Sequence, residues 1–287
     1  MNKADGKLSG KVCLITGATS GIGEVTAQEL ARLGYRVVIT ARDQAKLESA
    51  IARIRSNSGS QVVTGLVADL SSQDQVRSLA SKFIDQYDRL DVLINNAGAV
   101  YLRRTESVDG IEMTLAGNHL APFLLTNLLL DLLKHSSPAR IINVSSRAHE
   151  GQVIDFDDLQ YRKNYHFMRA YGKSKLANLL FTYELDRRLP GSEVTVNALH
   201  PGFVATNIGG NNGWLVRLFM PLIRLWAISP QEGAETSVYL ASSSEVAGVS
   251  GKYFYQKHPV LSSAFSRDED AARRLWDASV ELTGIDT

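Results

Sequence analysis

The sequence predicts an α/β protein built on one doubly wound, mostly parallel β-sheet with helices on both faces. Short runs of β-branched and aliphatic residues alternate with segments of helical periodicity along nearly all of the 287 residues. The strand runs are mostly apolar rather than alternating, which is typical of parallel strands buried on both faces. This repeated strand–helix order favours a single domain spanning residues 1–287.

Each element follows from its local composition. The expected strands are Lys11–Ile15, Arg36–Thr40, Val62–Val67, Val92–Asn95, Arg140–Val144, Val194–Leu199 and Lys252–Tyr255. The expected helices span residues 22–33, 44–56, 73–87, 110–134, 168–189, 231–242 and 268–282. The longest stretches outside this repeat, 147–169 and 207–229, follow predicted strand ends. Because ligands bind at the carboxyl edge of such sheets, we expect the functional site there.

Charge and composition exclude several classes of protein. The 31 Lys and Arg residues balance the 30 Asp and Glu residues, which gives no reason to expect a nucleic-acid partner. The lone cysteine, Cys13, cannot form an internal disulfide, so we expect it to be buried in a cytoplasmic protein. The first ten residues are polar, and the apolar stretch His119–Leu133 is short and contains Pro122. We therefore expect neither a signal peptide nor a transmembrane anchor.

The histidines do not predict a metal site. None of them stands at metal-ligand spacing from another histidine or from the cysteine. We interpret all six as structural or exposed: His119, His135, His149, His166, His200 and His258.

A glycine-rich turn follows the first predicted strand and opens the first predicted helix. Glycines there permit a tight turn and close approach of the backbone to a phosphate, and a helix N-terminus favours an anion. The turn therefore predicts a dinucleotide site, although the same glycines would also serve a turn that only joins strand to helix. The candidate contacts are Gly17, Thr19, Ser20, Gly21, Ile22 and Gly23.

Cofactor choice depends on the residues after the second strand. Arg42 comes first, and its guanidinium can pair bidentately with the extra phosphate of NADP(H). Asp43 is the competing signal for NAD, but it also stands where the N-cap of the next helix is expected. We favour NADP(H).

The third and fourth strands end in further candidate cofactor contacts. Asp69, followed by Leu70, either accepts a hydrogen bond from the adenine amino group or caps the next helix. After the fourth strand, small residues allow close backbone approach, and asparagine amides can tie strands together. The candidates there are Asn96, Ala97 and Gly98.

Tyr171 and Lys175 stand four residues apart and therefore lie on one face of a helix. A free phenol has a pKa of about 10, so it needs a nearby cation to act as a base near neutral pH. Ser146, at the end of the fifth strand, can hydrogen-bond a substrate oxygen as charge develops on it. Asn118 can anchor a water that links Lys175 to solvent. Taken alone, a Tyr-x-x-x-Lys pair occurs by chance in many helices, and the isolated motif favours two surface residues.

The turn after the sixth strand completes the candidate site. Its candidate cofactor contacts are Pro201, Gly202, Val204 and Thr206, with Thr206 suited to a carboxamide. The apolar segment 207–229 follows directly. We predict that it is a lid over an apolar substrate pocket; packing on the domain and shallow membrane contact are the alternatives.

Taken together, these motifs resemble the short-chain dehydrogenase/reductase family along essentially the full length of the chain. TGATSGIG, NNAG, NVSS, YGKSK and the PG-x-x-x-T turn stand in the family's order. The resemblance implies a single Rossmann-fold domain and a catalytic tetrad of Asn118, Ser146, Tyr171 and Lys175. It also implies that Tyr171 and Lys175 contact the cofactor.

A narrower resemblance is to the retinol dehydrogenase-like subgroup. It rests on NVSS with Ala148-His149, on FDDLQ at residues 156–160, on SKLAN at 174–178 and on ALHPG at 198–202. It also covers SGKYF at 250–254 and Leu275-Trp276. Members of that subgroup usually begin with a membrane-anchoring segment, whereas this chain begins with a polar one.

The leading hypothesis is an NADP(H)-dependent oxidoreductase that interconverts a small apolar alcohol and its aldehyde or ketone. A nucleotide-binding sensor or scaffold without turnover is the alternative from another class, and a protochlorophyllide reductase-like enzyme is a further one. We expect a cytoplasmic protein that can form a homo-oligomer.

Overall fold

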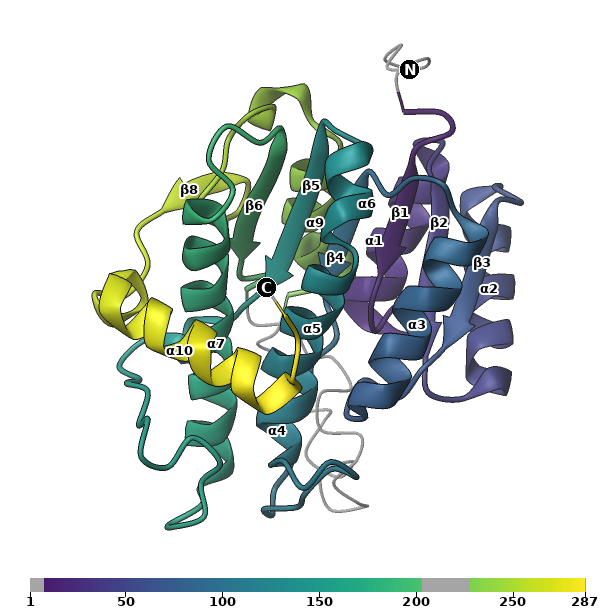
Figure 1. The fold of residues 1–287 in the computed structure, drawn as a ribbon. Helices are drawn as coiled ribbons and strands as arrows, with labels where there is room; N and C mark the ends of the chain where they lie inside the picture. The colour runs from purple at the N-terminus through teal and green to yellow at the C-terminus, as the bar shows by residue number, and fades with distance from the viewer. Residues whose placement is uncertain (1–7, 203–227, 287) are drawn as a thin grey trace.

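The structure is a computed structural model in which residues 8–202 and 228–286 are described. Its sheet has eight strands in the order β3-β2-β1-β4-β5-β6-β7-β8 (Figure 1). Neighbours from β3 to β7 pair in parallel, and β8 pairs antiparallel with β7. The chain winds outward from β1 in both directions, as the predicted doubly wound fold requires. The strands are β1 (Val12–Ile15), β2 (Arg36–Ala41), β3 (Val63–Val67), β4 (Val92–Asn95), β5 (Ala139–Val144), β6 (Val194–Leu199), β7 (Lys252–Tyr255) and β8 (His258–Val260).

Helices cover both faces of the sheet. One face carries α1 (Gly21–Arg32), α2 (Gln44–Ser58) and α9 (Pro230–Ser242). The other carries α3 (Gln73–Gln86), α5 (Ala121–Leu128), α6 (Leu130–His135) and α7 (Phe167–Arg187). The carboxyl-terminal helix α10 (Glu269–Thr283) lies outside this layer and packs against α7 (Figure 1).

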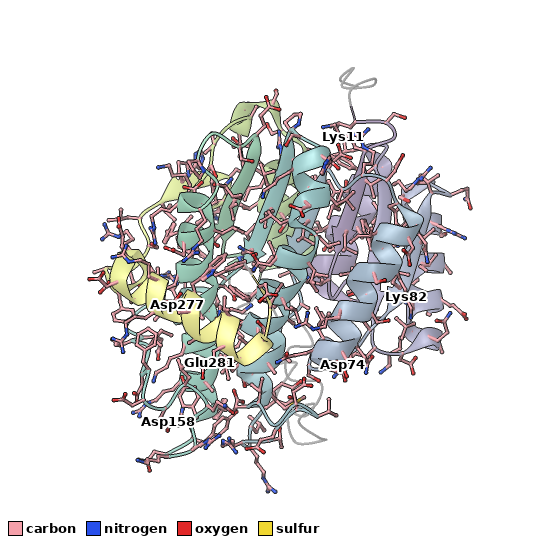
Figure 2. The ribbon with its side chains drawn as sticks, viewed as in Figure 1. Lys11, Asp74, Lys82, Asp158, Asp277 and Glu281 are labelled. Carbon is pink, nitrogen blue, oxygen red and sulfur yellow. The ribbon has the colours of Figure 1, made fainter. Side chains whose placement is uncertain are left out.

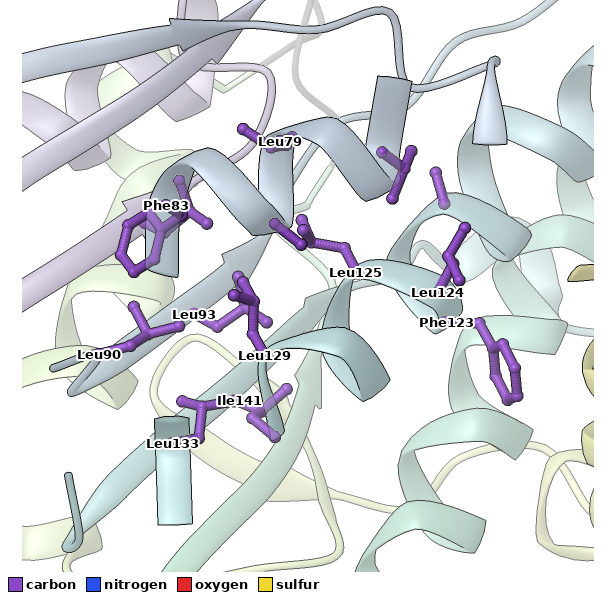
Figure 3. Close-up of a cluster of buried hydrophobic side chains, with 14 of the residues drawn as sticks. Leu79, Phe83, Leu90, Leu93, Phe123, Leu124, Leu125, Leu129, Leu133 and Ile141 are labelled. Atoms are coloured by element: carbon purple, nitrogen blue, oxygen red, sulfur yellow. The ribbon is translucent and has the colours of Figure 1, made fainter. Parts of the chain in front are cut away.

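The core is divided between the two faces by the alternation of side chains along each strand. Val12 and Leu14 of β1 join the cluster under α3, α5 and α7, while Cys13 and Ile15 join the cluster under α1 and α2. Figure 3 shows the first cluster, in which Phe83 of α3 and leucines of α5 meet the sheet. Both faces bury apolar residues, which explains why the strands read as continuous apolar runs.

The outer faces of the helices are polar. Asp74 and Lys82 on α3, and Asp277 and Glu281 on α10, are exposed on the surface (Figure 2). The buried residues of α10, among them Leu275 and Trp276, lie toward α7 and the core. This amphipathic pattern is what allows α10 to add a second layer of helix on this side.

Local capping explains where several helices begin. The Asp43 carboxylate accepts a hydrogen bond from the Lys46 N–H and so caps α2, as predicted. Ser72 caps α3. Ser229 and Glu232 cap α9 by bonding each other's backbone N–H groups. These side chains satisfy helix N–H groups that have no partner within the helix.

The prediction of one continuous helix over residues 110–134 is wrong. The segment begins at Met113 as α4 (Met113–Leu115), because the buried carboxylate of Glu112 accepts the N–H groups of residues 114 and 115. It continues as the π-helical turn η1 (Ala116–Leu120), then α5, and restarts as α6 after Leu129. Apolar periodicity does not reveal this π turn, because residues 111–126 are buried on nearly all sides and carry no clear apolar period.

An eighth strand adds to the seven that were predicted. β8 is three residues long, exposed and contains Pro259, so it lacks the apolar signature of the other strands. Gln256 and Lys257 form its hairpin turn with φ values of 48° and 68°. The sequence signal was missed because such turns normally carry Asn or Gly at these positions.

Candidate active site

The carboxyl edge of the sheet gathers the candidate residues from six strands. The glycine-rich turn follows β1, Arg42 follows β2, and Asp69 follows β3. Asn96 follows β4 and Ser146 follows β5, with Pro201 after β6. Because parallel strands end at one edge, residues far apart in the chain meet there.

Ser146 lies on a short turn that is bonded on several sides. It precedes the 3₁₀ turn η2 (Arg147–His149), and its hydroxyl oxygen accepts the Ala148 N–H at 3.2 Å. The neighbouring Ser145 donates its hydroxyl to the Lys175 carbonyl at 2.7 Å, which ties β5 to α7. The His149 ring nitrogen Nδ1 lies 2.7 Å from the Ser146 carbonyl. The position of Ser146 therefore depends on α7 and on His149.

Tyr171 meets Ser146 from helix α7. Burial raises the pKa of Tyr171, and the nearby Ser146 hydroxyl opposes this effect and lowers it. Gly172 follows directly, and a Cβ on it would stand 2.5 Å from the Ala148 carbonyl oxygen. Only glycine therefore lets η2 approach α7 closely enough to bring serine and tyrosine together.

Lys175 is buried one helical turn from Tyr171, with 3% of its surface exposed. Its ammonium donates to the Val144 carbonyl at 2.9 Å and lies 5.7 Å from the centre of the Tyr171 ring. Burial lowers the pKa of Lys175 to about 8. Burial is the cause of this shift, so the ammonium lies beside the phenol without a carboxylate that changes its pKa.

Asn118 lies in the π turn η1, behind the lysine. Its side chain accepts the Ala99 N–H at 2.8 Å and donates to the Ala99 carbonyl and to Ser174, both at 3.0 Å. The amide oxygen is thereby occupied. The α-helical donor for the Asn118 carbonyl would be residue 122, which is a proline and has no N–H.

The glycine-rich turn is held against the end of β4. Asn96 donates its amide to the carbonyls of Thr16 and Gly17, at 2.9 and 3.0 Å. The Thr16 hydroxyl accepts the backbone N–H groups of Asn96 and Ala97. A Cβ on Gly23 would stand 2.4 Å from the Asn96 amide nitrogen. The asparagine thus ties strands together as predicted, and Thr16 is a contact that the sequence analysis missed.

Two features of this edge fit a nicotinamide dinucleotide. Ser20 stands at the N-cap of α1 but makes no side-chain capping bond, so it leaves the first N–H groups of the helix to an anion. A Cβ on Gly98 would stand 3.1 Å from the Lys175 ammonium, so glycine keeps that ammonium open to a bound group. The residues present therefore fit such a cofactor.

The two residues after β2, Arg42 and Asp43, have different roles. Asp43 is occupied as the cap of α2, whereas Arg42 is exposed at the cofactor edge. The Arg42 guanidinium lies near the phenol of Tyr101, in the loop after β4. Burial is the main reason that the pKa of Tyr101 is raised. Arg42 thus remains available from its solvent side.

Of the two interpretations of Asp69, the helix cap is wrong. Ser72 occupies that position, and Asp69 instead accepts the N–H of Ser71 at 3.0 Å and its hydroxyl at 2.8 Å. Leu70 is partly buried against the core. The adenine contact remains the open interpretation of Asp69.

Of the turn after β6, Pro201 and Gly202 are described. Gly202 has a φ of +89° and donates its N–H to His200 Nδ1 at 3.2 Å. The His200 ring stacks on Tyr255, and burial is the main cause that lowers its pKa to about 4. Val204, Thr206 and residues 207–227 of the predicted lid lie outside the described residues.

Residues 8–202 and 228–286 show neither a metal-binding group nor a membrane-spanning helix. Within these ranges, no group of three or more His, Cys, Asp or Glu side chains is arranged to hold a metal ion. No helix there combines the length and apolar character needed to cross a membrane.

Comparison with known proteins gives the chain its relatives. The short chain dehydrogenase family model matches residues 11–213. Retinol dehydrogenase 14 of Mus musculus is 46% identical over 298 residues, covering 98% of this chain and 88% of the relative. The chain therefore belongs to the short-chain dehydrogenase/reductase family of oxidoreductases, which act on CH–OH and carbonyl groups. Within that family it falls in the retinol dehydrogenase-like subgroup.

Solved structures agree with this assignment. A crystal structure of an uncharacterized protein from Mycobacterium Paratuberculosis matches with a TM-score of 0.79 and 35% identity, covering 97% of this chain and 95% of the other. The NADP active-site complex of RhlG from Pseudomonas aeruginosa matches with a TM-score of 0.66 and 31% identity, covering 86% and 94%. These likenesses confirm the fold class and the resemblance drawn from the sequence motifs.

Proposed function

We propose that this protein is an NADP(H)-dependent oxidoreductase that interconverts an apolar alcohol and its aldehyde or ketone. One observation carries the proposal: the Tyr171 phenol lies near the Ser146 hydroxyl, which lowers its pKa, and beside the buried ammonium of Lys175. Tyr171 is thus an acid–base group that lies between Ser146, which can donate a hydrogen bond to an oxyanion, and the Lys175 ammonium, which stabilises a phenolate.

Each side chain has a role in carbonyl reduction. Tyr171 gives its phenol proton to the carbonyl oxygen, and Ser146 hydrogen-bonds the same oxygen as negative charge develops on it. The Lys175 ammonium stabilises the phenolate that remains. NADPH, when bound, supplies the hydride. In alcohol oxidation the same groups act in reverse, with Tyr171 as the base.

The backbone carbonyl of Asn118 would hold the water that returns a proton to Lys175. Residue 122, which would donate to the Asn118 carbonyl in a regular α-helix, is a proline without an N–H, and we propose that a water bonds this carbonyl. The asparagine side chain is engaged by Ala99 and Ser174, which holds the turn in place. We propose that such a water returns a proton to Lys175 after each turnover.

Arg42 supports the choice of NADP(H). It is exposed at the cofactor edge, where a guanidinium can pair with a 2′-phosphate, and Asp43 is engaged as a helix cap. RhlG, a structural relative, was solved with NADP. The other proposed cofactor contacts are those predicted from the sequence, among them Asp69 for the adenine.

The substrate class follows from the relatives. The name retinol dehydrogenase denotes an enzyme for a long apolar alcohol, and we propose a substrate of that chemistry here. A scaffold without turnover is the weaker interpretation, because a buried lysine destabilises a protein unless its proton is used.

We further propose that residues 1–287 form one domain that works in the cytoplasm. The single sheet joins elements from Val12 to Val260, which supports one domain. Cys13 is buried within β1, which suits a reducing compartment. A homo-oligomer remains a prediction to be tested by the mass in solution.

The direct test is a panel of apolar aldehydes, ketones and alcohols that includes retinal and retinol. Reduction is followed by NADPH consumption, in parallel with NADH. Tyr171→Phe is the control, because it removes the phenol hydroxyl but fills nearly the same space. We expect kcat to fall about 10²–10⁴-fold with cofactor affinity retained. Equal rates in both proteins would refute the assignment of Tyr171.

A further inference from the structure

We propose that His149 is a positioning residue of this site, whose imidazole holds Ser146 against Tyr171 and anchors that contact to the carboxyl-terminal segment. The inference rests on the proposed function. It concerns a histidine whose ring bonds the backbone carbonyl of Ser146 rather than its hydroxyl.

Both ring nitrogens of His149 are engaged. Nδ1 lies 2.7 Å from the Ser146 carbonyl oxygen, which can only accept, so Nδ1 carries the proton. Nε2 lies 3.3 Å from the Ser263 backbone nitrogen, which can only donate, so Nε2 is the acceptor. The two contacts therefore define one neutral tautomer.

The surroundings favour that neutral ring. His149 has no exposed surface, and its ring meets the Tyr253 ring edge-on at 5.3 Å. Burial lowers its pKa, although the Ser146 carbonyl and Glu150 act in the opposite direction. A protonated ring would have to donate at Nε2, where the Ser263 N–H already donates.

The bonds act on the residue that positions the serine hydroxyl. The Ser146 carbonyl accepts from His149 twice, from Nδ1 and from the backbone N–H at 3.2 Å. The Ser146 hydroxyl oxygen accepts the Ala148 N–H within the same turn. The turn lies against Gly172, next to Tyr171. If the ring bond is lost, η2 is free to shift relative to the phenol.

The other end of the link is remote in sequence. Ser263 follows β8 and stands 114 residues after His149. Its segment is also fixed from α7, where the Tyr183 phenol and the Ser262 hydroxyl lie 2.7 Å apart. Ser262 in turn accepts the hydroxyl of Ser266, at the start of the segment that leads into α10. The carboxyl-terminal segment thereby supports the reaction site.

Two variants separate the two ring bonds. An asparagine amide reaches the position of Nδ1 and can donate to the Ser146 carbonyl, whereas a glutamine side chain reaches the position of Nε2. Both remove the ring and leave a polar residue of similar burial. We expect His149→Asn to keep kcat within about threefold of the parent, and His149→Gln to lower it about 10- to 100-fold, since small misplacements of reacting groups have such effects.

The matched control is Tyr183→Phe. It removes a bond to the same segment at Ser262 but leaves both ring nitrogens of His149 engaged. We expect it to lower the melting temperature with kcat unchanged. Cofactor affinity, measured by calorimetry, should stay the same in all three variants.

A measurement without turnover distinguishes this inference from the proposed function. NMR titration of labelled tyrosine, assigned through Tyr171→Phe, reports the pKa of Tyr171. The nearby Ser146 hydroxyl lowers that pKa, so we expect His149→Gln to raise it and His149→Asn to leave it unchanged. This result would support the positioning role even if the substrate panel showed no turnover. Equal phenol pKa values in both variants, or an Nε2–H tautomer in the ¹⁵N spectrum, would overturn it.

Discussion

The glycine-rich turn and the Ser146 turn lie at the same edge of the sheet, but they are held in place by different means. The first is held by its own glycines and by the end of the neighbouring strand, through Thr16 and Asn96. The Ser146 turn relies on contacts from α7 and from a segment beyond β8.

This difference separates cofactor binding from the chemical step. A turn that presents backbone N–H groups needs little beyond the correct backbone path. A serine that must hydrogen-bond an oxygen beside a phenol needs its position set closely, which takes support from several elements. We therefore expect changes in the two regions to affect different kinetic parameters.

The largest effects are expected from a glycine-to-alanine substitution in each of the two regions. In Gly172→Ala the new Cβ would stand 2.5 Å from the Ala148 carbonyl oxygen and push η2 away from α7. We expect kcat to fall about 100-fold while the cofactor dissociation constant stays the same. In Gly23→Ala the clash is with Asn96 and the glycine-rich turn, so cofactor affinity should fall instead.

Gly117→Ala serves as the control for this pair. Gly117 lies in a helical turn, and a Cβ on it would meet nothing within 4 Å. We expect this variant to keep both parameters and to gain about 0.5 kcal/mol of stability. Steady-state kinetics with calorimetric cofactor titration covers all three variants. If both clashing variants lost the same parameter, the two regions would not be separable.

Cofactor selectivity tests the first region by charge rather than by shape. Arg42→Ala should weaken NADPH binding about 10- to 50-fold and leave NADH binding nearly unchanged, because only NADPH carries the 2′-phosphate. Asp43→Asn is the matched control, since asparagine caps a helix as well as aspartate does. If Arg42→Ala lowered the affinities for NADPH and NADH equally, another group would set cofactor selectivity.

The pH profile tests the second region. Lys175 holds its proton below its folded-state pKa of about 8 and loses it above that value. We expect kcat/KM for carbonyl reduction to be flat below pH 8 and to fall about tenfold per pH unit above it. Stopped-flow assays in overlapping buffers measure this decline. A profile that stayed flat up to pH 10 would show that the ammonium is not required.

Lys175 also affects the stability of the fold. Lowering the pKa of Lys175 from 10.5 to about 8 costs the folded state roughly 3 kcal/mol at neutral pH, since each pKa unit is about 1.4 kcal/mol. The lost hydrogen bond to Val144 offsets part of this gain, so Lys175→Met should add roughly 1 to 2 kcal/mol while abolishing activity.

The sign of this effect can be checked by pH. Between about pH 8 and 10.5 the unfolded lysine holds its proton and the folded one does not, so the stability of the parent rises with pH in that window. The advantage of Lys175→Met should therefore shrink toward pH 10.5. Urea unfolding at pH 7 and at pH 10 measures both values. Destabilisation by Lys175→Met at pH 7 would contradict the predicted cost of the buried charge.

Much of the fold could be predicted because its signals are local. Apolar runs identified seven strands within about a residue of their ends, and Asp43 could be named as a helix cap from its position alone. The π turn at Asn118 and the strand β8 were missed. Their backbone paths are stabilised by packing and by a hairpin turn whose residues, Gln256 and Lys257, carry no turn signature.

The candidate site also has parts that the sequence determined and parts that only the tertiary structure decided. The sequence by itself determined the fold class, the glycine-rich turn and the spacing of Tyr171 and Lys175 on one helix face, because backbone preference and helical periodicity act over a few residues. Only the tertiary structure decided that Gly172 admits η2, that His149 links Ser146 to Ser263, and that burial lowers the pKa of Lys175. Those properties depend on which distant segments pack together, and short-range spacing carries no record of that packing.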